Sequence, residues 1–225
     1  MDWTVVTLTL RLALTVTLVL LLIATPIAWW LSQTASRWKG LISAVCTMPM
    51  VLPPTVLGFY LLVLMGPHGP LGSLFNAMGI PRLPFSFMGI VIACTVHSLP
   101  FVVQPLENSF KAIGKAPLEA AATLRCPPYK VFLEVALPLA WPGILSAAIM
   151  GFCHTLGEFG VVLMVGGNIP GQTRVLSVAI YSHVEAMEYA QAHMLAGGLV
   201  IISLLALLMI HAIQGYGAFL RQESA

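Results

Sequence analysis

Residues 12–31 read LALTVTLVLLLIATPIAWWL, twenty consecutive residues without a charge. A helix needs about 20 apolar residues to cross the roughly 30 Å hydrocarbon core of a bilayer. The whole chain has the same character: its 225 residues are 59% hydrophobic and 8% charged, whereas a soluble domain carries about 25% charged residues. This composition excludes a soluble enzyme, a disordered chain and a nucleic-acid-binding protein, and it predicts an all-α integral membrane protein.

Five apolar stretches are long enough to cross a membrane. They are residues 12–31, 41–65, 89–106, 139–165 and 195–219. The first is read as a retained span and not as a cleaved signal peptide, because its apolar run is long and no soluble domain follows it. We therefore expect about five transmembrane helices, and six are possible if one segment is re-entrant.

The basic residues predict how these spans are oriented. Seven lie on one side of the predicted spans: Arg37, Lys39, Lys111, Lys115, Arg125, Lys130 and Arg221. Three lie on the other side: Arg11, Arg82 and Arg174. Because lysine and arginine concentrate in cytoplasmic loops, we expect an outside N-terminus and a cytoplasmic C-terminus.

Two of the predicted spans contain helix-breaking residues. The second holds Pro49, Pro53 and Pro54, and each proline removes a backbone donor. The fourth contains the run Leu-Gly-Glu-Phe-Gly at 156–160. Broken backbone in a bilayer is tolerated where protein or a water-filled cavity satisfies it. Both a packing kink and the wall of a translocation pathway remain open.

The candidate residues at these two breaks are Pro53, Pro54, Thr55, His154, Gly157, Glu158 and Gly160. A carboxylate is costly to place in lipid, so Glu158 is expected to have a role. We favour a structural tie, in which Glu158 accepts hydrogen bonds from freed backbone N–H groups and from His154, over direct contact with a substrate. Thr55 is a candidate hydroxyl for meeting a tetrahedral anion, together with backbone N–H groups at broken helix ends.

Residues 108–138 form a predicted cytoplasmic loop that contains a short helix. Pro117 suits a first helical position, Glu119 suits the first turn, and alanines follow. Cys-Pro-Pro at 126–128 breaks this helix, and residues 129–137 resume it up to Pro138. From composition, the short helix is either a docking element for a partner or an amphipathic helix on lipid headgroups.

The motif within this loop resembles the EAA loop of type I ABC importer permeases. The resemblance rests on Glu119-Ala120-Ala121, Thr123-Leu124, Phe132 and Leu137-Pro138. It implies a coupling helix that sits in a groove of a cytoplasmic ATPase subunit. The implied coupling residues are Glu119, Ala120, Ala121, Leu124, Arg125, Leu137 and Pro138. Arg125 stands where that family usually has glycine, so we expect the prolines to make the turn.

Further segments resemble the molybdate branch of these permeases, with sulfate and tungstate permeases as its nearest relatives. They are residues 52–58, 137–144, 156–160 and 167–173. The resemblance implies a single transmembrane permease domain over 1–225 with the type I importer fold, in the bacterial inner membrane. It also implies a homodimer, with cytoplasmic ABC ATPase subunits and an external oxyanion-binding protein as partners. Residues 173–188 predict a short outer helix, which either docks such a binding protein or lies at the membrane interface.

Several catalytic signatures are absent from the sequence. It contains no G-x-x-x-x-G-K-[ST] phosphate loop, no H-E-x-x-H and no G-x-S-x-G. We therefore expect no enzyme activity and no bound cofactor or metal, with ATP-Mg handled by the partner ATPase. The function expected from the resemblance is import of an oxyanion, molybdate first, with a sulfate or tungstate ABC permease as the alternative. Less favoured are a proton-coupled secondary transporter that titrates His154 and Glu158 and, last, a membrane enzyme.

Overall fold

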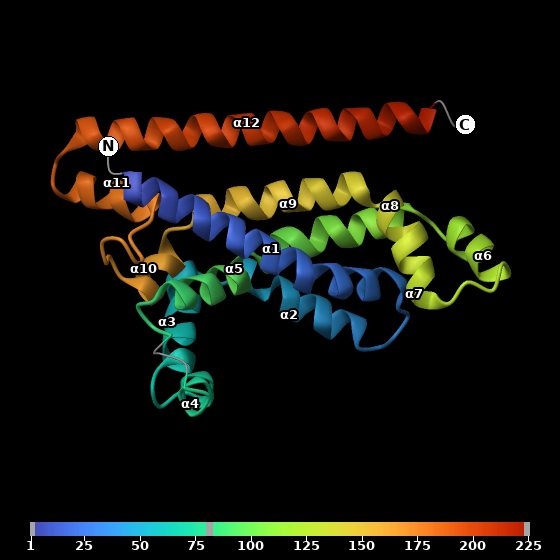
Figure 1. The fold of residues 1–225 in the computed structure, drawn as a ribbon, viewed down its shortest axis with the longest axis horizontal. Coiled ribbons are helices and arrows are strands. Elements are labelled where there is room, and N and C mark those ends of the chain that lie inside the picture. The colour runs from blue at the N-terminus through green and yellow to red at the C-terminus, as the bar shows by residue number, and fades with distance from the viewer. Residues whose placement is uncertain (1–2, 80–82, 223–225) are drawn as a thin grey trace.

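The structure is a computed structural model that describes residues 3–79 and 83–222, with side chains described up to residue 212. In these ranges every regular element is a helix. The central layer contains α1 (Trp3–Gln33), α5 (Phe87–Ala112) and α9 (Trp141–Leu156), which pack against one another (Figure 1). The prediction of an all-α fold is confirmed.

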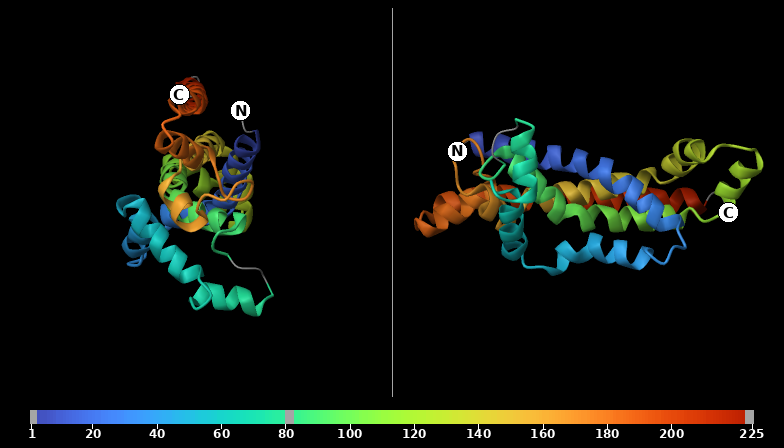
Figure 2. Two further views of the ribbon diagram at one scale, coloured as in Figure 1. Left: turned by 90° about the vertical axis from the view of Figure 1, so that its left-hand side faces the viewer. Right: turned by 90° about the horizontal axis from the view of Figure 1, so that it is seen from below.

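The remaining elements surround this layer. They are α2 (Lys39–Val51), α3 (Pro54–Met65), α4 (Pro70–Ala77), α6 (Ala116–Thr123), α7 (Pro128–Lys130), the π-helical segment η1 (Val131–Ala136), α8 (Leu137–Leu139), α10 (Gly160–Gly166), α11 (Leu176–Glu185) and α12 (Tyr189–Gln222). Helix α11 confirms the predicted short helix within 173–188. Helix α2 runs along one side of the bundle, and α3 turns sharply away from the direction of α2, as the view from below shows (Figure 2).

The described helices supply between three and five membrane spans. Three single helices are long and apolar enough to cross: α1, α5 and the part of α12 up to Ala212. Two more spans result if bent pairs are counted, namely α2 with α3, bent by 112°, and Pro128–Leu139 with α9, bent by 73°. The predicted fourth span is not one straight helix, because α9 ends at Leu156 and α10 starts anew at Gly160.

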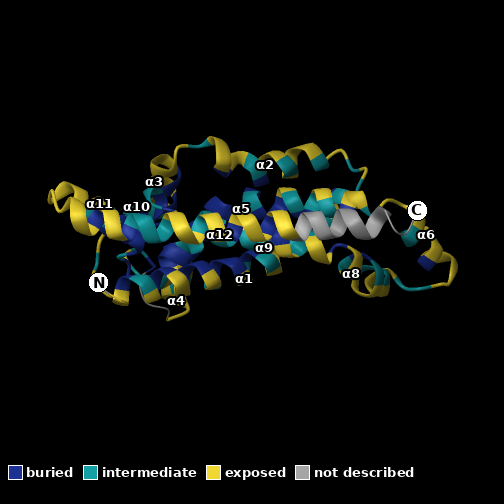
Figure 3. Ribbon diagram, turned by 90° about the horizontal axis from the view of Figure 1, so that it is seen from above, coloured by how far each residue is buried: buried dark blue, intermediate teal, exposed yellow. Residues whose placement is uncertain are grey.

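Burial follows the helical period on the central helices. Leu12, Val16 and Leu20 line one face of α1, and Leu106 and Phe110 lie on α5; all five are at most 1% exposed. In contrast, 11% of the apolar window of α12 is buried in the chain, and α12 runs along the outside as a mostly exposed helix (Figure 3). Exposed leucines suit a helix that faces lipid or another subunit.

The two ends of the bundle agree with the predicted alternation of the spans. The start of α1 lies at the same end as α10 and α11, whereas α6 lies at the opposite end, toward which α12 runs (Figure 1). The predicted coupling loop and the C-terminal helix end therefore share one side. Of the basic residues used for the orientation, Arg82 lies outside the described residues.

Candidate functional site

Helix α6 presents the coupling motif at the end of the bundle. It starts with a proline in its first turn and carries Glu119 there, where the positive end of the helix dipole favours a carboxylate. Ala121 is buried, whereas Glu119, Ala120 and Leu124 are exposed. Leu124, which follows the last turn of α6, is 78% exposed.

Arg125, and not the prolines, makes the turn after α6. Its φ is +57°, in the left-handed region. The Arg125 N–H donates to the Ala122 carbonyl at 2.9 Å, and the Cys126 N–H donates to the Ala121 carbonyl at 3.3 Å. This is the Schellman pattern, in which a left-handed residue satisfies the last carbonyls of a helix. The expectation that Pro127 makes the turn is therefore wrong, and Arg125 adopts the geometry that glycine ordinarily supplies.

The chain does not end its helix at Pro138, contrary to the prediction. Leu137 is half-buried and Pro138 exposed, and helix α8 continues through both to Leu139. The preceding η1 segment is π-helical, a geometry with i→i+5 hydrogen bonds that often occurs at functional sites. The bend of 73° comes instead at Ala140, between α8 and α9.

An aromatic cluster joins η1 to the central helices. Phe132 of η1 lies 5.3 Å from Trp29 of α1 and 6.2 Å from Phe110 of α5, measured between ring centroids, and Trp29 lies 5.3 Å from Phe110. Edge-on and tilted rings at such distances attract one another by about 0.5–1.5 kcal/mol per pair. Packed aromatic side chains therefore join η1 directly to α1 and α5.

The breaks in the two interrupted spans lie against each other. Helix α2 ends at Val51, and α3 restarts with Pro54 in its first turn and Pro53 as its N-cap. A Cβ atom on Gly160, the first residue of α10, would lie 2.8 Å from the Cβ of Pro54. Glycine is thus required at 160 for this close approach. Pro53, Pro54 and Thr55 are exposed in the single chain.

Glu158 ties the second break together, as the preferred interpretation predicts. It is 6% exposed, and its Oε1 accepts a hydrogen bond from the Val161 N–H at 3.0 Å. Its Oε2 lies 3.1 Å from Nε2 of His97 on α5, and its backbone carbonyl accepts a hydrogen bond from the Ser177 hydroxyl at 2.5 Å. One residue therefore links the α9–α10 break to α5 and to the segment that begins α11.

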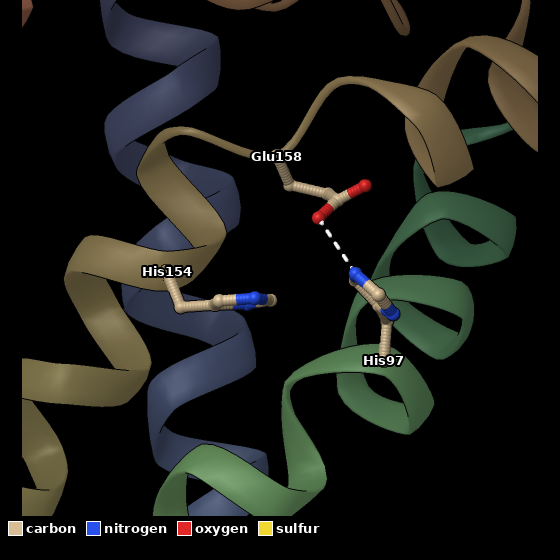
Figure 4. Close-up of side chains that lie close together, drawn as sticks. All are labelled: His97, His154 and Glu158. Carbon is tan, nitrogen blue, oxygen red and sulfur yellow. Dashed lines mark ion pairs between the residues drawn. The ribbon is translucent and has the colours of Figure 1, made fainter. Parts of the chain in front are cut away.

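His154 is not the donor to Glu158, contrary to the prediction. Its Nδ1 lies 2.9 Å from the Ser98 hydroxyl, and its ring stacks on Phe101 with centroids 3.8 Å apart. The ring nevertheless points toward His97 and the carboxylate (Figure 4). Because Gly157 breaks α9 between the two residues, the i, i+4 face shared in a continuous helix is lost.

His97 is not among the residues that the sequence indicated as candidates. An ionisable residue inside a span is by default a candidate for a functional site, and this was the available signal. No spacing pattern connects position 97 to position 158, because the two lie on different helices. The sequence predicted no metal site, yet within residues 3–79 and 83–222 the structure brings potential ligand atoms of His97, His154 and Glu158 within 4.8 Å of one another.

The loop at 166–174 is held by its own side chains. The Thr173 hydroxyl donates to the Gly166 carbonyl at 2.6 Å and accepts from the Ile169 N–H at 3.2 Å. Arg174 donates from Nε to the Asn168 side-chain oxygen at 2.6 Å. Gly167 takes a φ of +65°, a conformation that glycine adopts at little cost. These internal hydrogen bonds therefore give the loop a defined conformation at the end of the bundle opposite α6.

Comparisons with known proteins agree with this arrangement. Residues 24–216 match the family model described as "Binding-protein-dependent transport system inner membrane component". The chain is 58% identical over 217 residues to the molybdenum transport system permease protein ModB of Azotobacter vinelandii, covering 96% of both chains. It is 32% identical over 207 residues to a probable sulfate transport system permease protein, cysT, of Chlorella vulgaris, covering 92% of this chain and 77% of that protein.

Solved structures show the same fold. An inward-facing structure of the MetNI methionine ABC transporter aligns with a TM-score of 0.63 and 17% identity, covering 99% of this chain and 97% of the solved one. A bacterial alginate ABC transporter in complex with an alginate pentasaccharide-bound periplasmic protein aligns with a TM-score of 0.64 and 14% identity, covering 90% and 75%. With the matched residues and the identity to ModB, the chain belongs to the family of binding-protein-dependent transport system inner membrane components.

Proposed function

We propose that this chain is the membrane-spanning subunit of an ATP-driven ABC importer that moves molybdate into the bacterial cell. The assignment of molybdate as the substrate rests on the 58% identity to a ModB permease over 96% of the chain. The probable sulfate permease at 32% identity makes sulfate the alternative substrate, with tungstate as a third oxyanion of the same tetrahedral shape.

The proposed complex contains two copies of this chain, two cytoplasmic ATPase subunits and a periplasmic binding protein. Two observations support the homodimer. About five spans enclose little space by themselves, and two-fold dimers are the commonest symmetric assembly. Helix α6 supports ATPase docking through its exposed Glu119, Ala120 and Leu124. The alginate transporter solved with a periplasmic protein supports a binding protein at the opposite end, near the loop at 166–174 and α11.

In this mechanism the chain performs no covalent chemistry. ATP closes the ATPase subunits and moves α6, and the aromatic cluster of Trp29, Phe110 and Phe132 passes that movement to α1 and α5. Helix α5 contacts the α9–α10 break through His97 and Glu158, so the movement reaches that break and reopens the pathway toward the outside. Hydrolysis on the ATPase resets the spans. ATP-Mg is bound by the partner, since this sequence has no phosphate loop.

Reconstituted uptake tests the proposal. The chain and its ATPase are reconstituted in proteoliposomes. ATP is supplied on the side that carries the ATPase, the binding protein is added on the opposite side, and transport of radiolabelled molybdate is measured. We expect ATP-dependent uptake that unlabelled molybdate and tungstate suppress at lower concentration than sulfate does. Uptake driven by a pH gradient without the ATPase would establish the secondary-transporter alternative, and stronger competition by sulfate would reassign the substrate.

Labelling tests the proposed orientation. A single cysteine at Ala120, in a background without the four native cysteines, is exposed to a membrane-impermeant maleimide in intact spheroplasts. With α6 in the cytoplasm, it reacts only after the membrane is permeabilised. Reaction in intact spheroplasts would reverse the sidedness and remove the ATPase-docking role.

A further inference from the structure

The break in the fourth span places three side chains with metal-binding atoms around one point. His154 lies in the last turn of α9, Glu158 in the break itself, and His97 on the facing helix α5 (Figure 4). One potential ligand atom from each residue lies within 4.8 Å of the other two. We propose that His97, His154 and Glu158 bind one transition-metal ion of the zinc type.

The ligand types point to a borderline transition metal. Two imidazoles and one carboxylate are the protein ligands of several zinc enzymes, and such sites keep a fourth position for water or another ligand. Calcium and magnesium prefer oxygen ligands, and this cluster offers one carboxylate. The three clustered ligands include no sulfur atom, which copper(I) would favour. Zinc and cobalt(II) are therefore the ions that fit this set.

The spacing of the ligands is close to that of a zinc site. Zinc–ligand distances of 2.0–2.2 Å in a tetrahedron place neighbouring ligand atoms about 3.3 Å apart. Nε2 of His97 and Oε2 of Glu158 are already 3.1 Å apart. With all three atoms within 4.8 Å, the remaining separations close by no more than about 1.5 Å, which a side-chain rotation supplies.

The surrounding hydrogen bonds orient two of the ligands. Metal-binding histidines usually donate their second ring N–H to a neighbouring acceptor. Nδ1 of His154 lies 2.9 Å from the Ser98 hydroxyl, so donation to Ser98 leaves the Nε2 lone pair of His154 free for a metal. Oε1 of Glu158 is held by the Val161 N–H at 3.0 Å, which leaves Oε2 as the ligand atom.

A metal ion bound to these buried side chains would change how the helices are held together. His97 and Glu158 are each 6% exposed, and Nδ1 of His97 has no hydrogen-bond partner among the described residues. A metal ion would replace the His97–Glu158 contact with two coordinate bonds and would add His154 to the link. It would thereby clamp α5 to the end of α9 and to the break that follows it.

Cobalt substitution tests the proposal directly. The chain is purified through a tag without histidine, treated with a chelator, dialysed and titrated with Co²⁺. We expect one Co²⁺ per chain with visible d–d absorption of a nitrogen- and oxygen-ligated tetrahedral site, and one Zn²⁺ per chain by elemental analysis after zinc loading. His97→Ala and His154→Ala should each weaken binding by at least tenfold.

The control variant is His211→Ala, because His211 is exposed on α12 and lies outside the cluster. It should bind like the wild type. Equal binding by His97→Ala, His154→Ala and the wild type would overturn the proposal, since the metal would then sit elsewhere. Absence of the d–d bands in the wild-type protein would also overturn it, and this readout does not depend on any variant folding. Molybdate uptake plays no part in the test, so its outcome is independent of the transported substrate.

Discussion

The strongest test of the interpretation of Glu158 compares two substitutions of its carboxylate. Glu158→Gln keeps the size of the side chain and an oxygen that can accept the Val161 N–H, but it replaces a charge-assisted contact with His97 by a neutral one. Glu158→Ala removes both contacts and leaves His97 and the Val161 N–H unpaired at a site that is 6% exposed. A structural tie predicts a graded loss of stability.

The magnitudes follow from the two contacts. A hydrogen bond to a charged group contributes about 1.5–3 kcal/mol and a neutral one about 0.5–1.5 kcal/mol, so Glu158→Gln should cost about 1–2 kcal/mol. Breaking a buried pair by removing one partner costs about 3–5 kcal/mol. At roughly 2–4 °C per kcal/mol for a chain of this length, the Gln variant should melt about 5 °C and the Ala variant about 12 °C below the wild type.

The assay is thermal unfolding of the detergent-purified protein, with a chelator present so that bound metal does not contribute. Glu185→Gln is the matched control, because Glu185 is exposed on α11 and its carboxylate contacts only the Tyr181 hydroxyl among the described side chains. It should change the free energy of unfolding by less than about 0.5 kcal/mol. An Ala variant as stable as the Gln variant would refute the tie. A Gln variant of wild-type stability that had lost transport would instead assign Glu158 a charge-dependent role.

Three further predictions concern the coupling helix and the helix packing. Glu119→Lys should reverse the favourable charge on α6 and lower recovery of the ATPase in pull-downs while membrane insertion persists; unchanged recovery would contradict the docking role. Gly143→Ala should destabilise by about 1–3 kcal/mol in thermal unfolding, because its Cβ would lie 2.4 Å from the Cβ of Ser109. Gly198→Ala is the control, because nothing lies within 4 Å of the added Cβ; it should be neutral or stabilise by up to about 1 kcal/mol. Equal effects of Gly143→Ala and Gly198→Ala would refute the packing argument. Arg125→Gly should stabilise the turn after α6 by about 0.5–1 kcal/mol and slow amide hydrogen exchange in α6 by about 2–5-fold, because glycine adopts a positive φ without the side-chain penalty; faster exchange would count against it.

The spans and the helix breaks were predictable because each depends on local chemistry. Long uncharged runs predict membrane helices through the cost of exposing polar backbone to lipid, and clustered prolines and glycines favour a helix break. A single proline does not fix one: Pro49, counted among the helix-breaking residues of the second span, lies inside α2, as Pro26 lies inside α1. The breaks after Val51 and Leu156 lie where these residues indicated. The turn at Arg125 was not predictable in the same way, since a left-handed arginine is selected by the hydrogen bonds it closes and not by its own preference.

The partners of Glu158 could not be predicted from the local sequence alone. Position 158 in a broken span indicated a buried carboxylate in need of partners, and this expectation is met. The packing of α5 against the break decides which histidine contacts the carboxylate. It places His97 beside Glu158, whereas His154 contacts Ser98 and Phe101. Residues separated by some sixty positions have no spacing rule, because their distance is set by the packing of whole helices. Membrane insertion and helix interruption are thus properties of short stretches of the chain, whereas the polar cluster between helices exists only once those helices have packed.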